Sequence, residues 1–417
     1  MARWISWQFL IGGMVLLSCQ LLAGEKGATM ERGTVKLDEE ASRIHQEGFV
    51  FDGHNDVPWR LRELEDLSFR IIDLRKHQKE MHTDIPRLRR GNVGAQFWSA
   101  YVPASTAKKG TAVRDTLEQI DVIHRMIETY PDVFELAHTA ADVDRIRRKG
   151  KIASLIGVEG GHSIDNSLGV LRMYHRLGVK YLTLTHTDNV DWADSATDKP
   201  KNKGLSSFGE QVVREMNRLG MLVDISHVSP ATMNHVLNVT RAPVIASHSS
   251  AYALADHPRN VPDEVLKRIK ENGGVVMVNF YSGFITPEGA RVMRDGMSHY
   301  RKLAAEYSDK KELKAAWQAY RKERPFPRGS VHHVVDHIEH IIKMAGVDHV
   351  GLGSDYDGVD STPRQLDDVS TYPYITQVLL DRGYKKKDIH KILGENVLRV
   401  MRQAEKVARD SPTAPVP

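Results

Sequence analysis

The chain has 417 residues, of which 41% are hydrophobic and 27% charged, and its formal net charge is +4. This composition is typical of a soluble globular protein with enough apolar material for one large α/β domain or two smaller ones. The small net charge and the scattered basic residues, without a basic stripe interleaved with aromatics, argue against a nucleic-acid partner.

The first 18 residues have the pattern of an export signal. Arg3 supplies a positive start, and the apolar run that follows, Ile5 to Ser18, is short for a membrane span. Cys19, the only cysteine, comes directly after this run, as in bacterial lipoprotein signals, where the cysteine is lipidated and becomes the mature N-terminus. A plain secretory signal is the alternative, but no good small-residue cleavage site lies nearby. We therefore expect an exported, lipid-anchored protein of the bacterial periplasm or cell envelope.

The remaining polar segments suggest how the chain is divided. Residues 19–40 are small and polar and predict a linker, residues 41–405 form the predicted domain, and residues 406–417 form a polar tail. This tail lacks the hydrophobic stretch of a glycolipid-anchor signal, so we expect any membrane anchor to lie at the N-terminus. A single cysteine excludes a disulfide within the chain.

Eight short apolar runs predict buried parallel strands. They lie at residues 49–53, 93–101, 152–158, 181–185, 222–226, 244–247, 275–280 and 349–353. Helical patterns separate most of them, and glycine repeatedly stands between a helix and the next strand, at Gly178, Gly220, Gly273 and Gly346. Glycine is the expected helix stop because it accepts a left-handed backbone without steric cost.

Repeated helix–glycine–strand units predict a (β/α)₈ TIM barrel, with an insertion at residues 282–348, between strands seven and eight. A doubly wound open sheet is the alternative. No G-x-G-x-x-G follows the first strand, and polar residues gather at many strand ends, which favours the barrel. Four histidines within residues 332–344 of the insertion form no H-E-x-x-H motif, and we interpret them as a packed and solvated helix face.

Histidines and carboxylates follow six of the predicted strands. In a barrel all strand ends face one mouth, so side chains that are distant in sequence would meet there. These residues are His54 and Asp56, Glu159, His186, His227, His248, and Asp355 with Asp357. His54 and Asp56 are two apart, so both leave the strand tip on one face. Each residue alone could be structural, but the common position predicts a metal site, with zinc as the preferred ion.

The number of candidate ligands exceeds what one tetrahedral zinc needs. A two-metal site, with ions ~3.5–4 Å apart and one bridging carboxylate, would use them all. Glu159 is the expected bridge because it stands between the strand-one pair and the two later histidines. Two zinc ions would hold a shared water and lower its pKa towards ~7, which makes a bridging hydroxide available at neutral pH.

Several of these motifs also resemble those of the membrane (renal-type) dipeptidases. The similarity runs from about Ala41 to Met401, in the order of the family. It rests on the segments Phe51–Asp56, Gly157–His162, Leu182–His186, Asp224–His227, Ser247–Tyr252, His257–Pro262, Gly353–Gly358 and Lys391–Asn396. The resemblance implies a binuclear zinc dipeptidase on an amidohydrolase-type (β/α)₈ barrel, usually a homodimer.

The resemblance also implies a role for each site residue. His54, Asp56 and Glu159 would hold one zinc, while Glu159, His227 and His248 would hold the other. Two further residues would act on the substrate: His186 would stabilise the oxyanion, and Arg259 would clamp the free carboxylate of the dipeptide. Asp355 would take a proton from the bridging water and deliver it to the leaving amine.

The chain departs from the familiar animal members, which carry cysteines and a C-terminal lipid anchor. Asp188 also stands two residues after His186, where a cysteine or small residue is expected, and it could bias side-chain preference. Two other functions stay open: the same metal centre acting on another amide (a β-lactam, a cyclic amide or an N-acyl D-amino acid), and a non-catalytic metal-binding lipoprotein. Arg259 favours a substrate with a free carboxylate.

Overall fold

Nine parallel strands form the sheet at the centre of the protein. The computed structural model describes residues 32–307, 309–324 and 326–410. The strands are β1 (Val50–Asn55), β2 (Val93–Tyr101), β3 (Phe134–Leu136), β4 (Ile152–Glu159), β5 (Val179–Thr183), β6 (Leu222–Asp224), β7 (Ile245–Ala246), β8 (Val275–Val278) and β9 (Val350–Leu352). They pair in the order β2-β1-β9-β8-β7-β6-β5-β4-β3, with an additional pairing of β2 with β4.

The pairing of β2 with β4 closes eight of the strands into a barrel, which confirms the predicted (β/α)₈ fold. β3 lies outside the ring and pairs only with the first residues of β4, Ile152–Ser154. The sequence pattern missed β3 because its three residues are too few to show a period. Side chains from seven barrel strands, including Phe51, Phe97 and Tyr181, pack together as the barrel interior.

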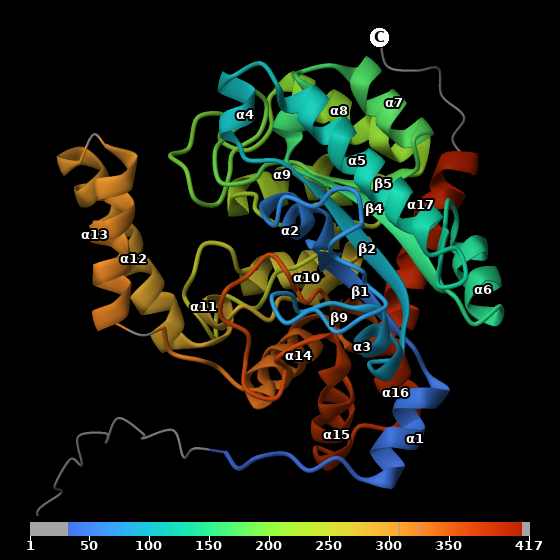
Figure 1. Cartoon of the computed structure of the whole chain (residues 1–417). Coiled ribbons are helices and arrows are strands. Elements are labelled where there is room, and N and C mark those ends of the chain that lie inside the picture. The colour runs from blue at the N-terminus through green and yellow to red at the C-terminus, as the bar shows by residue number, and fades with distance from the viewer. Residues whose placement is uncertain (1–31, 308, 325, 411–417) are drawn as a thin grey trace, which may run out of the picture. The chain divides into compact units, whose positions relative to one another are not determined.

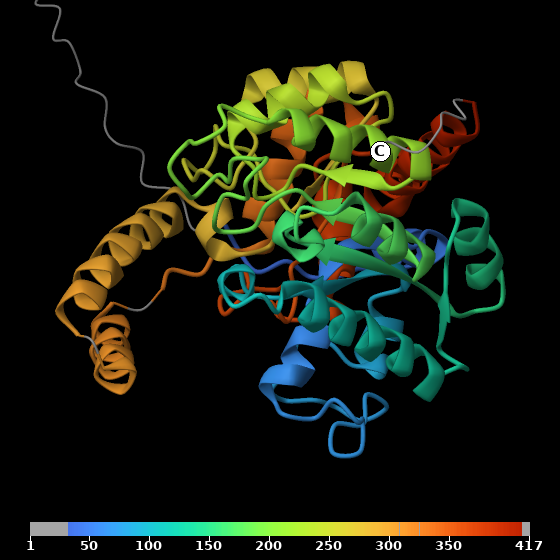
Figure 2. The same cartoon turned by 90° about the horizontal axis from the view of Figure 1, so that it is seen from above.

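Helices surround the barrel, as Figures 1 and 2 show. Those before the insertion are α1 (Glu39–Glu47), α2 (Val57–Glu63), α3 (Ile85–Arg90), α4 (Ser105–Lys108), α5 (Ala112–Thr129), α6 (Ala140–Arg148), α7 (Leu168–Arg176), α8 (Ser207–Leu219), α9 (Pro230–Val239) and α10 (Asp263–Asn272). Those after it are α15 (Pro373–Asp381), α16 (Lys386–His390) and α17 (Asn396–Asp410). The four predicted glycine stops all have positive φ, between 70° and 100°.

The insertion lies between β8 and β9, the seventh and eighth strands of the barrel, as predicted. It contains α11 (Ser282–Ile285), α12 (Pro287–Glu306), α13 (Lys310–Glu323) and α14 (Val331–Ala345). α12 and α13 form a hairpin that projects away from the barrel in both views (Figures 1 and 2). In α14, His337 is buried and bonds the backbone of Ala251 and Ile285, which agrees with a packing role for this helix.

The predicted strand and domain limits differ from the structure by a few residues. β5 ends at Thr183, not 185, and β6 ends at Asp224, not 226. The apolar runs continue because the loops leading to the barrel mouth are themselves buried, so hydrophobicity there does not mark pairing. The compact unit begins at Val35 and its first helix at Glu39, before the expected domain start at 41.

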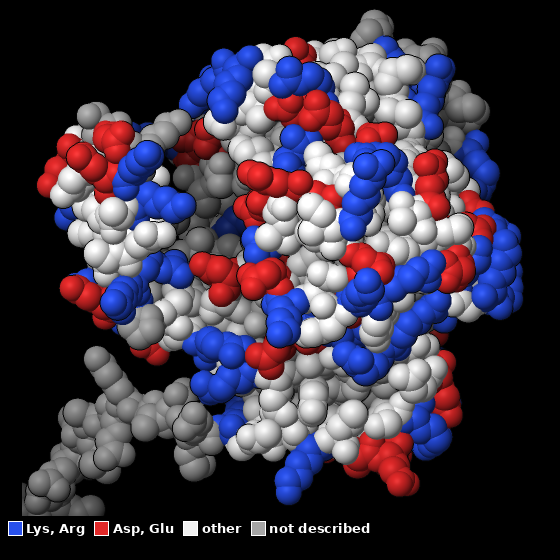
Figure 3. Space-filling model, viewed as in Figure 1, with Lys and Arg blue, Asp and Glu red and all other residues white. Residues whose placement is uncertain are grey.

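The last helix also differs from expectation. α17 continues to Asp410, so the expected tail from 406 begins with helical residues, because Ala404 and Val407 still pack on the core. The proposed signal segment and Cys19 lie outside the described residues. Within the described part of the chain, no helix has the length and apolar character needed to cross a membrane. On the face in Figure 3, positive and negative side chains are intermixed, without a basic stripe.

Candidate metal centre

The predicted strand-end residues meet at the mouth of the barrel. A cavity of about 660 Å³ opens there, and seven of the predicted residues line it: Asp56, Glu159, His186, His227, Arg259, Asp355 and Asp357. His54 and His248 are buried and complete the cluster around Glu159. Parallel strands deliver all their C-terminal ends to one rim, which is why residues about 300 positions apart in sequence come into contact.

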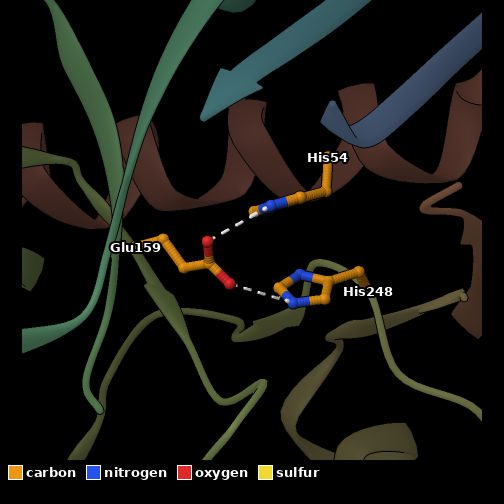
Figure 4. A group of neighbouring side chains, drawn as sticks. All are labelled: His54, Glu159 and His248. Atoms are coloured by element: carbon orange, nitrogen blue, oxygen red, sulfur yellow. Dashed lines mark ion pairs between the residues drawn. The ribbon is translucent and has the colours of Figure 1, made fainter. Parts of the chain in front are cut away.

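Glu159 lies between histidines from different strands (Figure 4). Its Oε2 is 3.5 Å from Nε2 of His54, and its Oε1 is 3.4 Å from Nε2 of His248. Oε1 is also 2.9 Å from Nε2 of His227 and 3.7 Å from Nε2 of His186. The two carboxylate oxygens therefore face different imidazoles, the arrangement that a bridging ligand requires.

Three overlapping groups of side chains could each hold a cation. His54, Glu159 and His248 form one, Glu159, His186 and His227 a second, and His54, Asp56 and Asp355 a third, with ligand atoms within 4.8 Å of one another in each. His54 and Glu159 each belong to two groups, so the three groups form one continuous candidate metal site. The expected division between two ions stays a prediction.

The protonation states suit metal binding. Burial lowers the pKa of His227 and of His248 well below the ordinary value, so both imidazoles are neutral at pH 7 and keep a free lone pair. Burial alone would raise the pKa of Glu159, but His54, His186 and the other imidazoles outweigh it and hold that pKa well below its usual range. The site thus combines the neutral imidazoles of His227 and His248 with an ionised carboxylate, whereas Tyr181, Asp56 and Glu159 outweigh burial and raise the pKa of His54 well above its ordinary value.

Two hydroxyl groups orient His54 and His248 by contacting the ring nitrogen that faces away from the cluster. The Tyr181 hydroxyl is 2.8 Å from Nδ1 of His54, and the Ser247 hydroxyl is 2.8 Å from Nδ1 of His248. The Ser247 hydroxyl also donates to Asp224, at 2.6 Å. Partners on Nδ1 turn Nε2 towards the cluster, as the outer partners of metal-bound histidines do.

The residues at the mouth fit a metal ion. His54 Nε2 and Asp56 Oδ1 are buried without a hydrogen-bond partner, and the Nε2 atoms of His227 and His248 lie only 2.9 Å apart. Buried polar atoms are normally satisfied, and a cation among these atoms would satisfy them all. Nitrogen and carboxylate oxygen donors are those that zinc prefers.

Arg259 lies in the wall of the same cavity and is almost fully buried. Its guanidinium donates to the Ser249 hydroxyl and to the His248 carbonyl, both at 3.3 Å, while its Nε has no partner. It forms no ion pair with any carboxylate of the described chain. Burial lowers its pKa to about 10, which still leaves it charged at pH 7. A buried cation without an anionic partner is suited to receive one from a ligand.

Asp355 and His186 also line the cavity at the mouth. Asp355 accepts a hydrogen bond from the Asn279 amide at 2.8 Å, and burial together with neighbouring carboxylates raises its pKa. His186 lies between the rings of Tyr101 and His227, at centroid distances of 4.8 and 4.3 Å. Burial lowers the pKa of His186, so the neutral ring can donate one N–H to an oxyanion.

The backbone at the mouth is unusual. His227, Asp355 and Asp357 have φ of 65°, 64° and 66°, in the left-handed region that side chains other than glycine rarely adopt. Such strain is typical of functional sites. Gly358 passes so close to the carboxylates that a Cβ there would lie 2.2 Å from Asp56 Oδ2. Only glycine fits this position without moving a site residue.

Sequence reasoning missed the residues that support the site: Tyr181, Asp224, Ser247 and Asn279. Asn279 comes directly after β8, but the predicted strand ran to 280 and hid this strand end. Tyr181 lies two positions before Thr183 and shares its inward face, so strand alternation could have identified it. Asp357 lines the mouth as predicted, but it accepts a hydrogen bond from the His82 amide at 2.7 Å and belongs to none of the three candidate groups.

Residues 38–415 match the family described as membrane dipeptidase (peptidase family M19). The chain belongs to the membrane dipeptidase family. It is 44% identical over 367 residues to dipeptidase aclJ of Aspergillus oryzae. That alignment covers 86% of this chain and 78% of the relative. It is also 43% identical to dipeptidase tcpJ of Claviceps purpurea, in an alignment that covers 86% of this chain and 77% of that protein. The protein is therefore an enzyme of a metallopeptidase family.

Two solved structures share the barrel fold. The probable dipeptidase PvdM from Pseudomonas aeruginosa superposes with a TM-score of 0.76 at 23% identity, over 88% of this chain and 98% of that one. The second structure is a metallopeptidase from Rhodobacter sphaeroides, liganded with a phosphinate mimic of the dipeptide L-Ala-D-Ala. It superposes with a TM-score of 0.69 at 25% identity, over 85% of this chain and 99% of that one. These two proteins therefore share the fold of this membrane dipeptidase family member.

Proposed function

We propose that this enzyme is a zinc dipeptidase that hydrolyses dipeptides with a free C-terminal carboxylate and binds two zinc ions per chain. The observation that carries the proposal is the position of Glu159 between histidines of different barrel segments, in the same cavity as a buried, unpaired Arg259. Family membership and the neighbour bound to a dipeptide mimic support the same substrate class.

The metal ligands would be the five residues expected from the sequence: His54, Asp56, Glu159, His227 and His248. When bound, the two cations would polarise the scissile carbonyl and lower the pKa of the attacking water, so that a hydroxide bridging them is available. The protein holds the substrate around this centre. Arg259 would bind the α-carboxylate through its forked donors, and this fixes the distance from the C-terminus to the scissile bond.

Two side chains would then move or hold protons. Asp355 would accept a proton from the attacking water and return it to the leaving amine; a raised pKa suits a group that must both take and give a proton near neutrality. His186 would donate its N–H to the carbonyl oxygen as negative charge develops there. Asn279 holds the Asp355 carboxylate in place through its amide.

A hydrolysis panel with a metal assay tests this function. Free dipeptides, the same dipeptides with an amidated C-terminus, a cyclic dipeptide and a β-lactam are each incubated with purified enzyme of measured zinc content. We expect about two zinc ions per chain and cleavage of the free dipeptides far above the rest. Equal cleavage of free and amidated dipeptides would contradict the substrate class, and active protein without metal would contradict the centre.

We also propose that the chain is exported and anchored through a lipid on Cys19, and that it forms a homodimer. The apolar run before Cys19 supports the anchor, and the family resemblance supports the dimer. Expression of the wild type and Cys19→Ala in a bacterial host tests the anchor, since only the wild type should fractionate with membranes. Light scattering of protein without residues 1–19 tests the dimer, and a monomeric mass would contradict it.

A further inference from the structure

A second cavity, of about 350 Å³, lies at the end of the barrel opposite the metal centre. Its position follows from Lys180, the second residue of β5, whereas the metal centre lies beyond the C-terminal ends of the strands. Helix ends and loops complete the wall. The lining residues are His138, Thr139, His175, Lys180, Leu219, Gly220, Glu405, Ala408 and Arg409. We name it the basic cavity.

Lys180 is the central feature of the basic cavity. Its neighbour Tyr181 points into the barrel, so strand alternation turns Lys180 outward, beneath the surrounding helices. It is only 7% exposed, yet it has neither a hydrogen bond nor an ion pair with any side chain of the described residues. A buried ammonium without a partner is costly, and burial lowers the pKa of Lys180 accordingly.

The nearest carboxylates are engaged elsewhere. Glu405 and Asp142 both act on Lys180 electrostatically, but neither approaches within ion-pair distance. Glu405 accepts the Ala140 amide at 2.7 Å, and Asp142 accepts from the backbone amide of Thr139 at the start of α6. The lysine therefore lines the cavity, and its three donors have no partner among the side chains that the structure describes.

The other charged groups of the cavity make it net positive. Arg409, exposed near the end of α17, has no ion pair with a described residue and adds a second cation at the rim. His138 and His175 add two imidazoles, and Glu405 is the only carboxylate that the described residues contribute to the wall. Burial lowers the pKa of His175 to about 4, so its neutral ring can still donate one hydrogen bond at pH 7.

We propose that the basic cavity binds a small oxyanion, a phosphate or carboxylate group, with Lys180 as its main partner and Arg409 at the rim. An anion would supply the charge and acceptors that Lys180 lacks within the chain. The volume exceeds that of inorganic phosphate and leaves room for a small phosphate ester or dicarboxylate. The site is separate from the catalytic mouth and does not depend on the proposed dipeptidase activity.

Calorimetric titration of the zinc-loaded enzyme tests the proposal, with inorganic phosphate and malonate as separate probes at constant ionic strength. Phosphate can also bind at the metal centre, so variants separate the sites. We expect a saturable event that is absent from Lys180→Met and retained in Arg259→Met. The probe with the tighter binding identifies the preferred oxyanion. Identical phosphate and malonate isotherms for the wild type and Lys180→Met would overturn the proposal.

A second pair of variants covers the case in which Lys180→Met does not fold. Arg409→Gln should weaken the same event about threefold, the effect of a partly screened charge contact. Arg402→Gln is its matched control, because Arg402 is exposed on the same helix but pairs with Asp144 and does not line the cavity. Equal affinities in these two variants would remove Arg409 from the site, and no saturable event in any form would refute the site itself.

Discussion

The hydroxyl of Tyr181 lies 2.8 Å from Nδ1 of His54, deep in the barrel. Tyr181 is fully buried and stands on β5, on the far side of the interior from β1. Through this contact a core aromatic residue sets the orientation of a candidate metal ligand. Packing and chemistry are therefore coupled at this position.

We predict that Tyr181→Phe weakens zinc binding by about tenfold, because the His54 ring loses the partner that fixes its orientation. Competition with a chelator of known affinity measures the change. Tyr174→Phe is the control, since that hydroxyl is also buried but bonds the Ser163 carbonyl, away from the centre. Unchanged zinc affinity in Tyr181→Phe would show that the hydroxyl does not support the ligand.

Asp355→Asn should lower kcat by about 10²–10⁴-fold while zinc content stays the same, because the amide cannot carry the proton. Turnover assays combined with metal analysis measure both quantities. Asp360→Asn is the comparison, since Asp360 lines the same cavity but pairs with Arg321 at the exposed rim. Normal turnover in Asp355→Asn would exclude Asp355 as proton carrier.

Arg259→Met should lower kcat/KM for free dipeptides by about 30-fold, the usual worth of a charge-assisted contact, and should abolish the preference over amidated dipeptides. Steady-state kinetics on matched free and amidated substrates measure this. Arg60→Met provides the control, because Arg60 also lines the cavity but pairs with Glu63 near the surface. A preference that survives in Arg259→Met would locate the carboxylate site elsewhere.

Gly358→Ala should reduce activity without unfolding the protein. The added Cβ would lie 2.2 Å from Asp56 Oδ2 and 2.7 Å from Asp355 Oδ1, so one or both carboxylates must move. Activity and thermal unfolding are measured together. Gly296→Ala, in α12, is the control because its new Cβ meets nothing closer than 3.4 Å. Full activity in Gly358→Ala would show that the loop can shift away.

Stability should fall in mild acid because of His45. Its Nε2 donates to the Gly91 carbonyl, its Nδ1 accepts from the Thr376 hydroxyl, and burial lowers its pKa from 6.5 to about 4. The unfolded chain takes up this proton at a higher pH than the folded chain. The contribution of neutral His45 to the free energy of unfolding is therefore complete above pH 6.5. As the pH falls towards 4, the protein loses this contribution of about 3 kcal/mol.

Urea unfolding between pH 7.5 and 4.5 measures this dependence. His45→Gln should lose part of the pH dependence of the unfolding free energy. His124→Gln, on the more exposed surface of α5, should keep all of it. Identical slopes in the wild type and His45→Gln would mean that His45 does not titrate on unfolding.

The residues at the barrel mouth could be predicted because they follow the strands directly in sequence. His54, Glu159 and His248 each end an apolar run, and the parallel arrangement then brings them to one rim. The supporting residues could not be found in this way. Ser247 and Asp224 matter only because β6 and β7 lie side by side, which local sequence does not reveal.

Sequence alone determined the fold class and the candidate ligands of this protein, because periodicity and residue type are local properties of the chain. Tertiary structure decided three other features: the neutral state of His227 and His248, the unpaired state of Arg259, and the unpaired state of Lys180 at the opposite end of the barrel. Burial and the absence of a partner depend on what the rest of the chain places around a side chain. These properties therefore appear only once distant segments have packed together.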